Sequence, residues 1–528
     1  MRSSHPRCLA VLTLALFLIP LATSRAADGL DARIKEVIAR PDYKQSRWGL
    51  LVVDANTGKP IYQHNADELF APASVTKLYT CAAALVALGP DHRFRTPVYR
   101  RGELVDGTLK GDLILVAKGD PTLGGRSDAN GHLVFKNSDH TYASFTSTLP
   151  ELTDTDPLAG LRALAQQIRK SGIRKVEGEV LIDDRLFTPS FGSGSGPKII
   201  TPIMVNDNLI DVIVAPGKAV GERASVQVRP KNEFMQTDVQ VETIGKDEKP
   251  TITVELVGLG RYVLRGGIPL GSRPLVRICP VADPESFARG LFIETLRREG
   301  VSVKASELRR PTVTLPDQDG YAGLTTVARY ESPPLSELLK VILKVSHNLY
   351  ASTLPLLLAS RNDKRTMAEG MALEGKILAE LGVNVKSIAL ETGAGGGSCD
   401  HVTPRATVEL LQGMARRSDF AVFRSALPVL GVDGTLVNVV GKDSPARGKV
   451  WAKTGTYVDN DLLNDRIYLR CKSLAGVMTA KSGRKLVFAV FLNHVPLPPG
   501  VNSTREGKLL GRLCEILYEH TPESVSQR

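Results

Sequence analysis

The chain of 528 residues has few cysteines, and none of them are paired in the sequence. The six cysteines lie far apart and form no C-x-x-C motif. Zinc ribbons and thioredoxin-like redox motifs need such pairs, so both are excluded. Five cysteines follow residue 26, so in a chain without the first 26 residues at least one thiol stays free or pairs with another chain.

Several catalytic signatures are also missing. There is no H-E-x-x-H and no G-x-S-x-G, and the glycine-rich "GAGGGS" is not followed by lysine. Zincin metalloproteases, α/β-hydrolases and phosphate-loop proteins are therefore not expected. The acidic loop 459–465 lacks the glycine at which a calcium loop turns. The nine histidines are scattered, which predicts surface positions, and we expect no metal and no cofactor.

Only the N-terminus carries a long apolar run. Two arginines precede the run at 9–21, and the small residues Ser24 and Ala26 follow it. This pattern is typical of a secretory signal peptide, residues 1–26, and the run is short for a membrane span, although an uncleaved anchor is the alternative. We expect a mature chain that begins near Ala27, exported to the periplasm or cell envelope without a permanent anchor.

The formal net charge of +11 makes the chain basic. No basic helix with interleaved aromatic residues is present, so nucleic acid is not an expected partner. An anionic wall or lipid surface would suit this charge, as would a simple soluble basic surface.

The hydrophobic pattern changes along the chain. Strand-like runs flank the turn residues 55–59, and an alanine- and leucine-rich helix is expected at 73–88. Residues 96–281 are rich in β-type runs and read as an insertion into another domain. Strands return near the C-terminus, with a hairpin through Ser482–Gly483, and are followed by a final helix. The apolar stripe of that helix, which predicts docking on a sheet, consists of Leu509, Leu510, Leu513, Ile516 and Leu517.

Three short motifs occur in a fixed order. They are S-x-x-K at Ser74–Lys77, S-x-N at Ser346–Asn348 and K-T-G at Lys453–Gly455. Each is weak alone, because these residues are common. Their joint occurrence, each in a fitting structural context, indicates a catalytic site.

The first two motifs supply a nucleophile and proton carriers. Ser74 needs a neighbour that takes its proton, and Lys77 lies one helical turn away on the same face. Burial and a nearby cation would keep Lys77 neutral part of the time, as a general base must be. Ser346 is predicted to relay a proton to the leaving amine, and Asn348 to hold the substrate or Lys77.

The third motif supplies groups for binding the substrate. Lys453 and Thr454 offer a cation and a hydroxyl, which suit a carboxylate. Gly455 allows the substrate backbone to lie close to the strand. Thr456 is predicted to add a second backbone N–H to that of Ser74 for a developing oxyanion. Together these groups predict acyl transfer on a peptide that ends in a carboxylate.

The motif set resembles the serine penicillin-binding protein and β-lactamase superfamily. Longer stretches, among them "PASVTKLYTCAAALVALGPDHRFRT", "VEGEVLIDDRLF" and "SLAGVMTAKSGRKLVFAVFLNH", are similar to the D-alanyl-D-alanine carboxypeptidase/endopeptidase family, the class C low-molecular-mass penicillin-binding proteins. The resemblance runs from about residue 45 to the C-terminus. It implies peptidoglycan peptides as substrates and β-lactam antibiotics as inhibitors.

The resemblance also implies a fold and a domain plan. The fold is an α/β transpeptidase-like domain, with an antiparallel sheet flanked by helices plus a helical lobe, split by a β-rich insertion. The catalytic domain would comprise residues 28–95 and 282–528, and the inserted unit residues 96–281.

The family pattern fails in three places. His347 stands where aspartate is usual, the loop 391–404 lacks a serine of the family's glycine-rich motif, and the link 456–472 is longer than usual. Two other functions share the three motifs: a β-lactamase or related serine esterase, and a non-catalytic penicillin-binding or wall-binding sensor. The preference between carboxypeptidase and endopeptidase action stays open.

Overall fold

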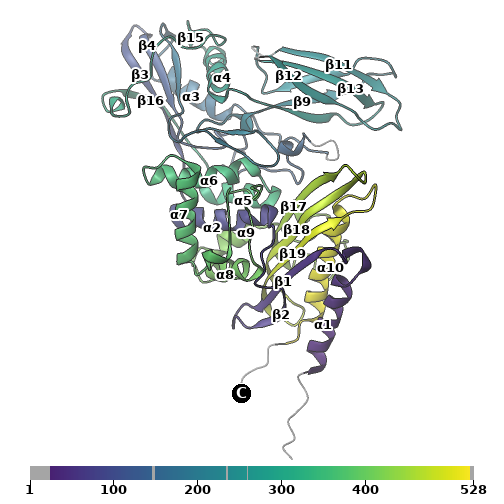
Figure 1. Cartoon of the computed structure of the whole chain (residues 1–528). Coiled ribbons are helices and arrows are strands. Elements are labelled where there is room, and N and C mark those ends of the chain that lie inside the picture. The colour runs from purple at the N-terminus through teal and green to yellow at the C-terminus, as the bar shows by residue number, and fades with distance from the viewer. Residues whose placement is uncertain (1–23, 145–148, 234–235, 259, 524–528) are drawn as a thin grey trace, which may run out of the picture.

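A five-stranded antiparallel sheet joins the two ends of the chain (Figure 1). The computed structural model describes residues 24–144, 149–233, 236–258 and 260–523. The strand order is β17-β18-β19-β1-β2, with β1 at Arg47–Asp54, β2 at Pro60–His64, β17 at Val450–Asp461, β18 at Arg466–Thr479 and β19 at Lys485–Pro496. The hairpins predicted at 55–59 and at Ser482–Gly483 connect β1 to β2 and β18 to β19.

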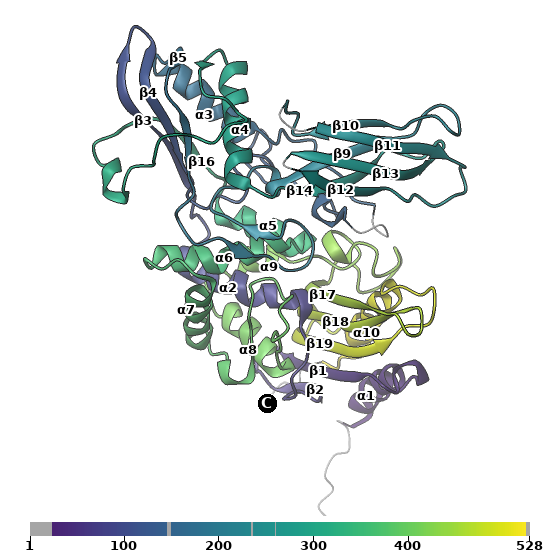
Figure 2. The same cartoon turned by 45° about the horizontal axis from the view of Figure 1, so that its top comes forward.

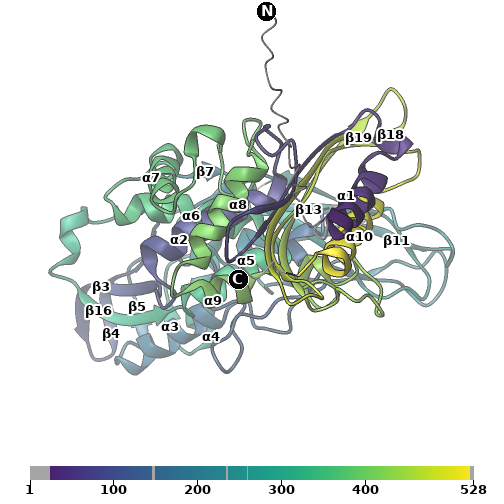
Figure 3. The same ribbon diagram turned by 90° about the horizontal axis from the view of Figure 1, so that it is seen from below.

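Both faces of this sheet are covered, which explains why β1 is apolar at almost every position. Leu50 and Val52 face one core, and Leu51 and Val53 face the other. Helices α1 (Ser24–Ile38) and α10 (Thr504–His520) lie side by side on the first face (Figure 3). The predicted apolar stripe of α10 is buried there.

The second face of the sheet packs against a helical lobe (Figure 3). Its helices are α2 (Thr76–Leu88), α5 (Leu335–Val345), α6 (Asn348–Arg361), α7 (Met367–Glu380), α8 (Pro404–Ala415) and α9 (Phe420–Ala426). Helix α2 lies in the middle of the lobe and is buried without interruption from Thr76 to Leu85, which explains its mostly apolar sequence. It ends at Gly89, whose positive φ of 82° suits glycine.

A second unit lies against the helical lobe (Figure 2). Its largest sheet has the order β15-β5-β4-β3-β16, with β6 paired to β4. These strands are β3 (Arg95–Val105), β4 (Thr108–Val116), β5 (Lys175–Val176), β6 (Val180–Asp183), β15 (Ser302–Val303) and β16 (Thr325–Glu331). Helices α3 (Ala159–Lys170) and α4 (Pro284–Arg298) share its core.

Three smaller sheets follow β6 and precede α4 in the chain, and two of them extend the second unit (Figure 2). One contains β9 (Leu209–Ala215), β10 (Ser225–Arg229) and β14 (Leu275–Pro280). Another contains β11 (Gln236–Ile244), β12 (Thr253–Gly258) and β13 (Arg261–Pro269). The third pairs β7 (Ser190–Phe191) with β8 (Ile199–Ile200).

The end of the inserted unit can be located by strand pairing. Strand β16 pairs with β3, and α4 packs in the same core as β4. Strand β16 and helix α4 both follow residue 281 in sequence. We therefore propose that the inserted unit extends to about residue 331, about 50 residues beyond the boundary predicted from hydrophobic pattern.

The predicted signal segment and the cysteines can also be located in the structure. The predicted signal segment lies outside the described residues except for positions 24–26, where α1 begins. Among the described helices none is long and apolar enough to cross a membrane. The five cysteines from Cys81 onward are free thiols, and only Cys399 is exposed.

Candidate active site

Ser74 and Lys77 meet at the start of the central helix. Ser74 lies in a 3-10 turn, Ala73–Val75, that leads directly into α2. The Lys77 side chain is fully buried, and its Nζ lies 2.8 Å from Ser74 Oγ. Two further acceptors hold the same amine, Asn348 Oδ1 and the carbonyl oxygen of Ala394, each at 2.7 Å.

Burial lowers the pKa of Lys77 to about 7, although nearby Asp400 opposes the shift. A neutral amine has two N–H donors and one lone pair. Because Asn348 and Ala394 accept both donors, the lone pair of the neutral form faces Ser74. This geometry suits a general base for the serine hydroxyl.

A glycine-rich loop brings Ala394 to the lysine. The loop follows Glu391 and packs directly on the turn that carries Ser74. A Cβ atom at Gly395 would lie 1.9 Å from the Ala73 carbonyl oxygen, and the φ of Gly395 is +87°. Glycine is therefore required for the approach that delivers the Ala394 carbonyl.

The S-x-N motif lies between α5 and α6, opposite Ser74. Ser346 ends α5 in a left-handed conformation with φ 63°. Its hydroxyl accepts a hydrogen bond of 2.9 Å from Lys453 Nζ. Asn348 begins α6 and is oriented by two contacts, since its Oδ1 accepts from Lys77 and its Nδ2 donates to Ser195 Oγ at 3.0 Å.

The K-T-G motif lies on β17, the edge strand of the sheet. Lys453 is fully buried, and burial together with the nearby charge of Lys77 lowers its pKa. Gly455 allows the strand to pass the nucleophile closely, because a Cβ atom there would lie 2.4 Å from the Pro72 carbonyl oxygen and 3.2 Å from the Ser74 nitrogen. The hydroxyl of Thr454 donates to Thr435 Oγ1 at 2.8 Å.

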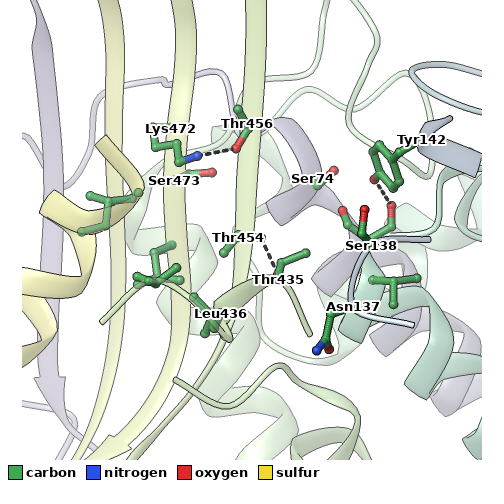
Figure 4. A pocket seen from close by; sticks show the side chains of 16 residues that line it. Ser74, Asn137, Ser138, Tyr142, Thr435, Leu436, Thr454, Thr456, Lys472 and Ser473 are labelled. Atoms are coloured by element: carbon green, nitrogen blue, oxygen red, sulfur yellow. Dashed lines mark hydrogen bonds between the residues drawn. The ribbon is translucent and has the colours of Figure 1, made fainter. Parts of the chain in front are cut away.

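These elements border a cavity of about 270 Å³ (Figure 4). Of the predicted site residues, Ser74, Ser346, Thr454 and Thr456 line it. Three further site residues, Lys77, Asn348 and Lys453, lie behind this surface. Lys77 bonds Ser74 and Asn348, and Lys453 bonds Ser346. The structure thus brings all three motifs into one site.

Sequence reasoning missed several residues of this site. Asn137, Ser138 and Tyr142 of the inserted unit line the cavity, and the Tyr142 hydroxyl donates to the Ser346 carbonyl oxygen at 2.7 Å. Lys472 also lines it and donates to Thr456 Oγ1 at 2.9 Å (Figure 4). None of these residues belongs to a short motif, and their positions depend on tertiary packing.

A buried ionic network lies behind the S-x-N motif. The guanidinium of Arg126 bonds Asp139 Oδ2 at 2.7 Å and Asp207 Oδ2 at 2.6 Å. His140 lies between Asp207 and Asp211, with ring nitrogen to carboxylate distances of 2.7 and 2.6 Å. All five side chains are buried and come from the inserted unit.

His347 connects this network to the catalytic motif. Its Nδ1 accepts from the Tyr350 backbone N–H at 3.3 Å and caps α6. Its Nε2 lies 3.3 Å from Asp207 Oδ2, so the neutral ring donates there. Burial lowers the pKa of His347, and Asp207 opposes this only in part. The prediction that the histidines lie on the surface is wrong for His140 and His347, because carboxylates inside the protein hold both rings.

Three members of the network have the arrangement of metal ligands. Asp139, Asp207 and His347 present ligand atoms within 4.8 Å of one another. The Arg126 guanidinium lies among them and bonds both carboxylates. A fixed cation thus already occupies the position where a metal ion would bind, and we propose no metal there.

Comparison with known proteins gives a consistent result. The model of the D-Ala-D-Ala carboxypeptidase 3 (S13) family matches residues 30–509. The D-alanyl-D-alanine carboxypeptidase of Actinomadura sp. (strain R39) is 28% identical over 86% of this chain and 83% of its own length. The D-alanyl-D-alanine carboxypeptidase DacB of Haemophilus influenzae is 26% identical, with 85% of each chain covered.

A solved structure shares the fold. Penicillin binding protein 4 (dacB) from Haemophilus influenzae matches with a TM-score of 0.69 and 21% identity, over 92% of this chain and 99% of that one. A second structure of that protein, complexed with a β-lactam, matches with a TM-score of 0.68 and 22% identity.

The ionic network predicts a dependence of stability on pH. Burial alone would lower the pKa of His140, but Asp211 and Asp207 outweigh it and raise the pKa from 6.5 to about 10. The protonated ring thus stabilises the fold fully below pH 6.5, and this contribution is lost as the pH rises toward 10. One pKa unit corresponds to about 1.4 kcal/mol, so the loss is on the order of several kcal/mol.

We expect His140→Gln to be less stable than the wild type at pH 6 and closer to it at pH 10. Denaturant unfolding at a series of pH values measures the difference in the free energy of unfolding. His132→Gln, at an exposed histidine of the same unit, is the control and should show no such trend. A constant difference between His140→Gln and wild type across this range would contradict the assignment.

Proposed function

The chain belongs to the D-Ala-D-Ala carboxypeptidase 3 (S13) family of penicillin-binding peptidoglycan hydrolases, and we propose that it cleaves D-Ala-D-Ala peptides through an acyl-enzyme on Ser74. The family match and the shared fold confirm the family, the serine carboxypeptidase class and the fold class expected from the motifs. The roles of single residues are our proposal. The observation that supports them most is the Lys77 Nζ to Ser74 Oγ contact of 2.8 Å. The same amine also bonds Asn348 Oδ1 and the Ala394 carbonyl oxygen, which orient it.

Acylation begins with neutral Lys77. It takes the Ser74 proton while Oγ attacks the carbonyl carbon of the penultimate D-Ala. The backbone N–H groups of Ser74 and Thr456 stabilise the oxyanion that forms. The close passage of β17 along the Ser74 turn, which Gly455 permits, supports this assignment.

The leaving amine needs a proton when the peptide C–N bond breaks. Ser346 donates it and regains a proton from Lys453, whose Nζ bonds its hydroxyl. Lys453 in turn takes up the proton that Lys77 removed from Ser74, so Lys77 is neutral again before water attacks. One proton leaves Ser74 and one reaches the leaving nitrogen, so the total charge of the site is unchanged after acylation. Water then attacks the ester, and Lys77 takes the water proton and returns it to Ser74 Oγ.

The same chemistry cleaves a cross-link when the leaving amine belongs to a neighbouring stem peptide. Endopeptidase action on peptidoglycan is therefore part of the proposal. A relative of this fold is complexed with a β-lactam, and we propose that β-lactams acylate Ser74 here too. We also propose export to the periplasm or cell envelope, on the signal-peptide pattern of residues 1–26.

The identity of the nucleophile can be tested by mass spectrometry. We expect wild type mixed with penicillin to gain one adduct that persists for many minutes. Ser74→Ala should form none and should release no D-Ala, since it lacks the attacking oxygen. The control is Ser425→Ala, at an exposed serine of α9 whose hydroxyl donates to the Val422 carbonyl oxygen, and this variant should be labelled as the wild type is.

The lifetime of the adduct separates the alternatives. Rapid loss of the adduct with release of hydrolysed penicillin would indicate a β-lactamase. A persistent adduct without any D-Ala release would leave only the sensor function.

The pKa of Lys77 predicts the pH dependence of acylation. The base form of Lys77 is populated as the pH rises through about 7. We therefore expect the second-order rate constant for penicillin acylation to rise with pH and to reach half its maximum near pH 7. Quenched reactions between pH 5 and 9, analysed by intact mass, measure it. A rate that is constant over this range would exclude Lys77 as the base.

A further inference from the structure

Three lysines lie near the substrate cavity, Lys77, Lys453 and Lys472, and of these only Lys472 lines it. Lys453 is fully buried, and its Nζ donates to Ser346 Oγ and to the Thr454 carbonyl oxygen. Its side chain is not part of the cavity lining. Lys472 does line the cavity, and its Nζ bonds the hydroxyl of Thr456 (Figure 4).

The fold places Lys472 next to the K-T-G strand. In the register of β17 and β18, Lys472 lies directly opposite Thr456. Its side chain runs toward α10 and approaches Gly507. A Cβ atom at Gly507 would lie 3.4 Å from Lys472 Cε and 3.6 Å from its Nζ, which is ordinary van der Waals contact, so the lysine packs against α10.

The surroundings of Lys472 favour a charged amine at neutral pH. Burial lowers its pKa to about 8, while Cys471 and Glu506 oppose the shift. Glu506, on α10, is buried, and its Oε2 has no hydrogen-bond partner among the described residues. Lys472 thus remains mostly protonated at pH 7, and the group that accepts from its amine is a neutral hydroxyl.

We propose that Lys472 is the cation that binds the terminal carboxylate of the substrate, together with the hydroxyl of Thr456. This inference rests on the proposed peptidase function. An ammonium that already bonds Thr456 Oγ1 leaves the O–H of Thr456 free to donate to a carboxylate. Lys453 then acts on the reaction through Ser346, and its contact with the substrate is indirect.

Carboxylate recognition can be separated from catalysis with two matched substrates. One is an acylated peptide ending in D-Ala-D-Ala, and the other is the same peptide ending in D-alaninamide, which has no charge. Lys472→Met should lower kcat/KM on the carboxylate peptide by about tenfold or more, because a charge-assisted hydrogen bond is lost. On the amide peptide the change should stay below about twofold.

Three further variants control for charge, folding and the second lysine. Lys508→Met removes an exposed lysine of α10 near the same edge of the sheet and should affect neither substrate selectively. Lys472→Gln can keep the hydrogen bond to Thr456 without the charge and should lose carboxylate preference as Lys472→Met does. Lys453→Met should slow both substrates to a similar extent.

The amount of protein that penicillin labels at saturation gives the folded fraction of every variant. Equal losses on both substrates in Lys472→Met and Lys472→Gln, or no loss on either, would overturn the inference. If wild type instead cleaves neither peptide and takes up no penicillin, the proposed function itself fails. The two failures can be distinguished, because the first is measured on the Lys472 variants and the second on the wild type.

Discussion

The removal of Lys77 from water is the condition on which the rest of the site depends. An exposed lysine keeps its proton at neutral pH and cannot act as a base. Here α2 carries Lys77 into the middle of the helical lobe, and its pKa falls to about 7. Asn348 and the Ala394 carbonyl then fix its orientation. The helix, the S-x-N turn and the glycine-rich loop can therefore be understood as parts of one enclosure around a single amine.

The inserted unit adds contacts to this enclosure. Ser195 accepts from Asn348, and Tyr142 bonds the backbone of Ser346. Behind them the Arg126 network reaches His347, which caps α6. The insertion supplies no member of the three motifs, but its side chains contact all three residues of S-x-N. It is therefore a structural component of the site.

The fold was predicted from the resemblance to a known family, and the contact between Ser74 and Lys77 from the spacing of one motif. The helix after Ser74, the strand that carries Lys453 and the hairpins of the sheet follow from apolar periodicity and turn residues. The Ala394 carbonyl could not be predicted, since every residue has one and only the approach of Gly395 to Ala73 selects it. His140 gave no signal either, because its ring is held by two carboxylates that lie 67 and 71 residues away in the sequence.

The pairing of β1 with β19 links residues that are more than 400 positions apart. Asn493 of β19 also bonds the backbone of Ala71 on both its N–H and C=O, three residues before the nucleophile. The segment that holds Ser74 therefore lacks its final support until the last strand of the sheet has been synthesised. Contacts of such long sequence separation form slowly in folding. A chain that is still growing carries the serine and its lysine but not a finished catalytic centre, so hydrolytic activity begins only after β19 has joined the sheet.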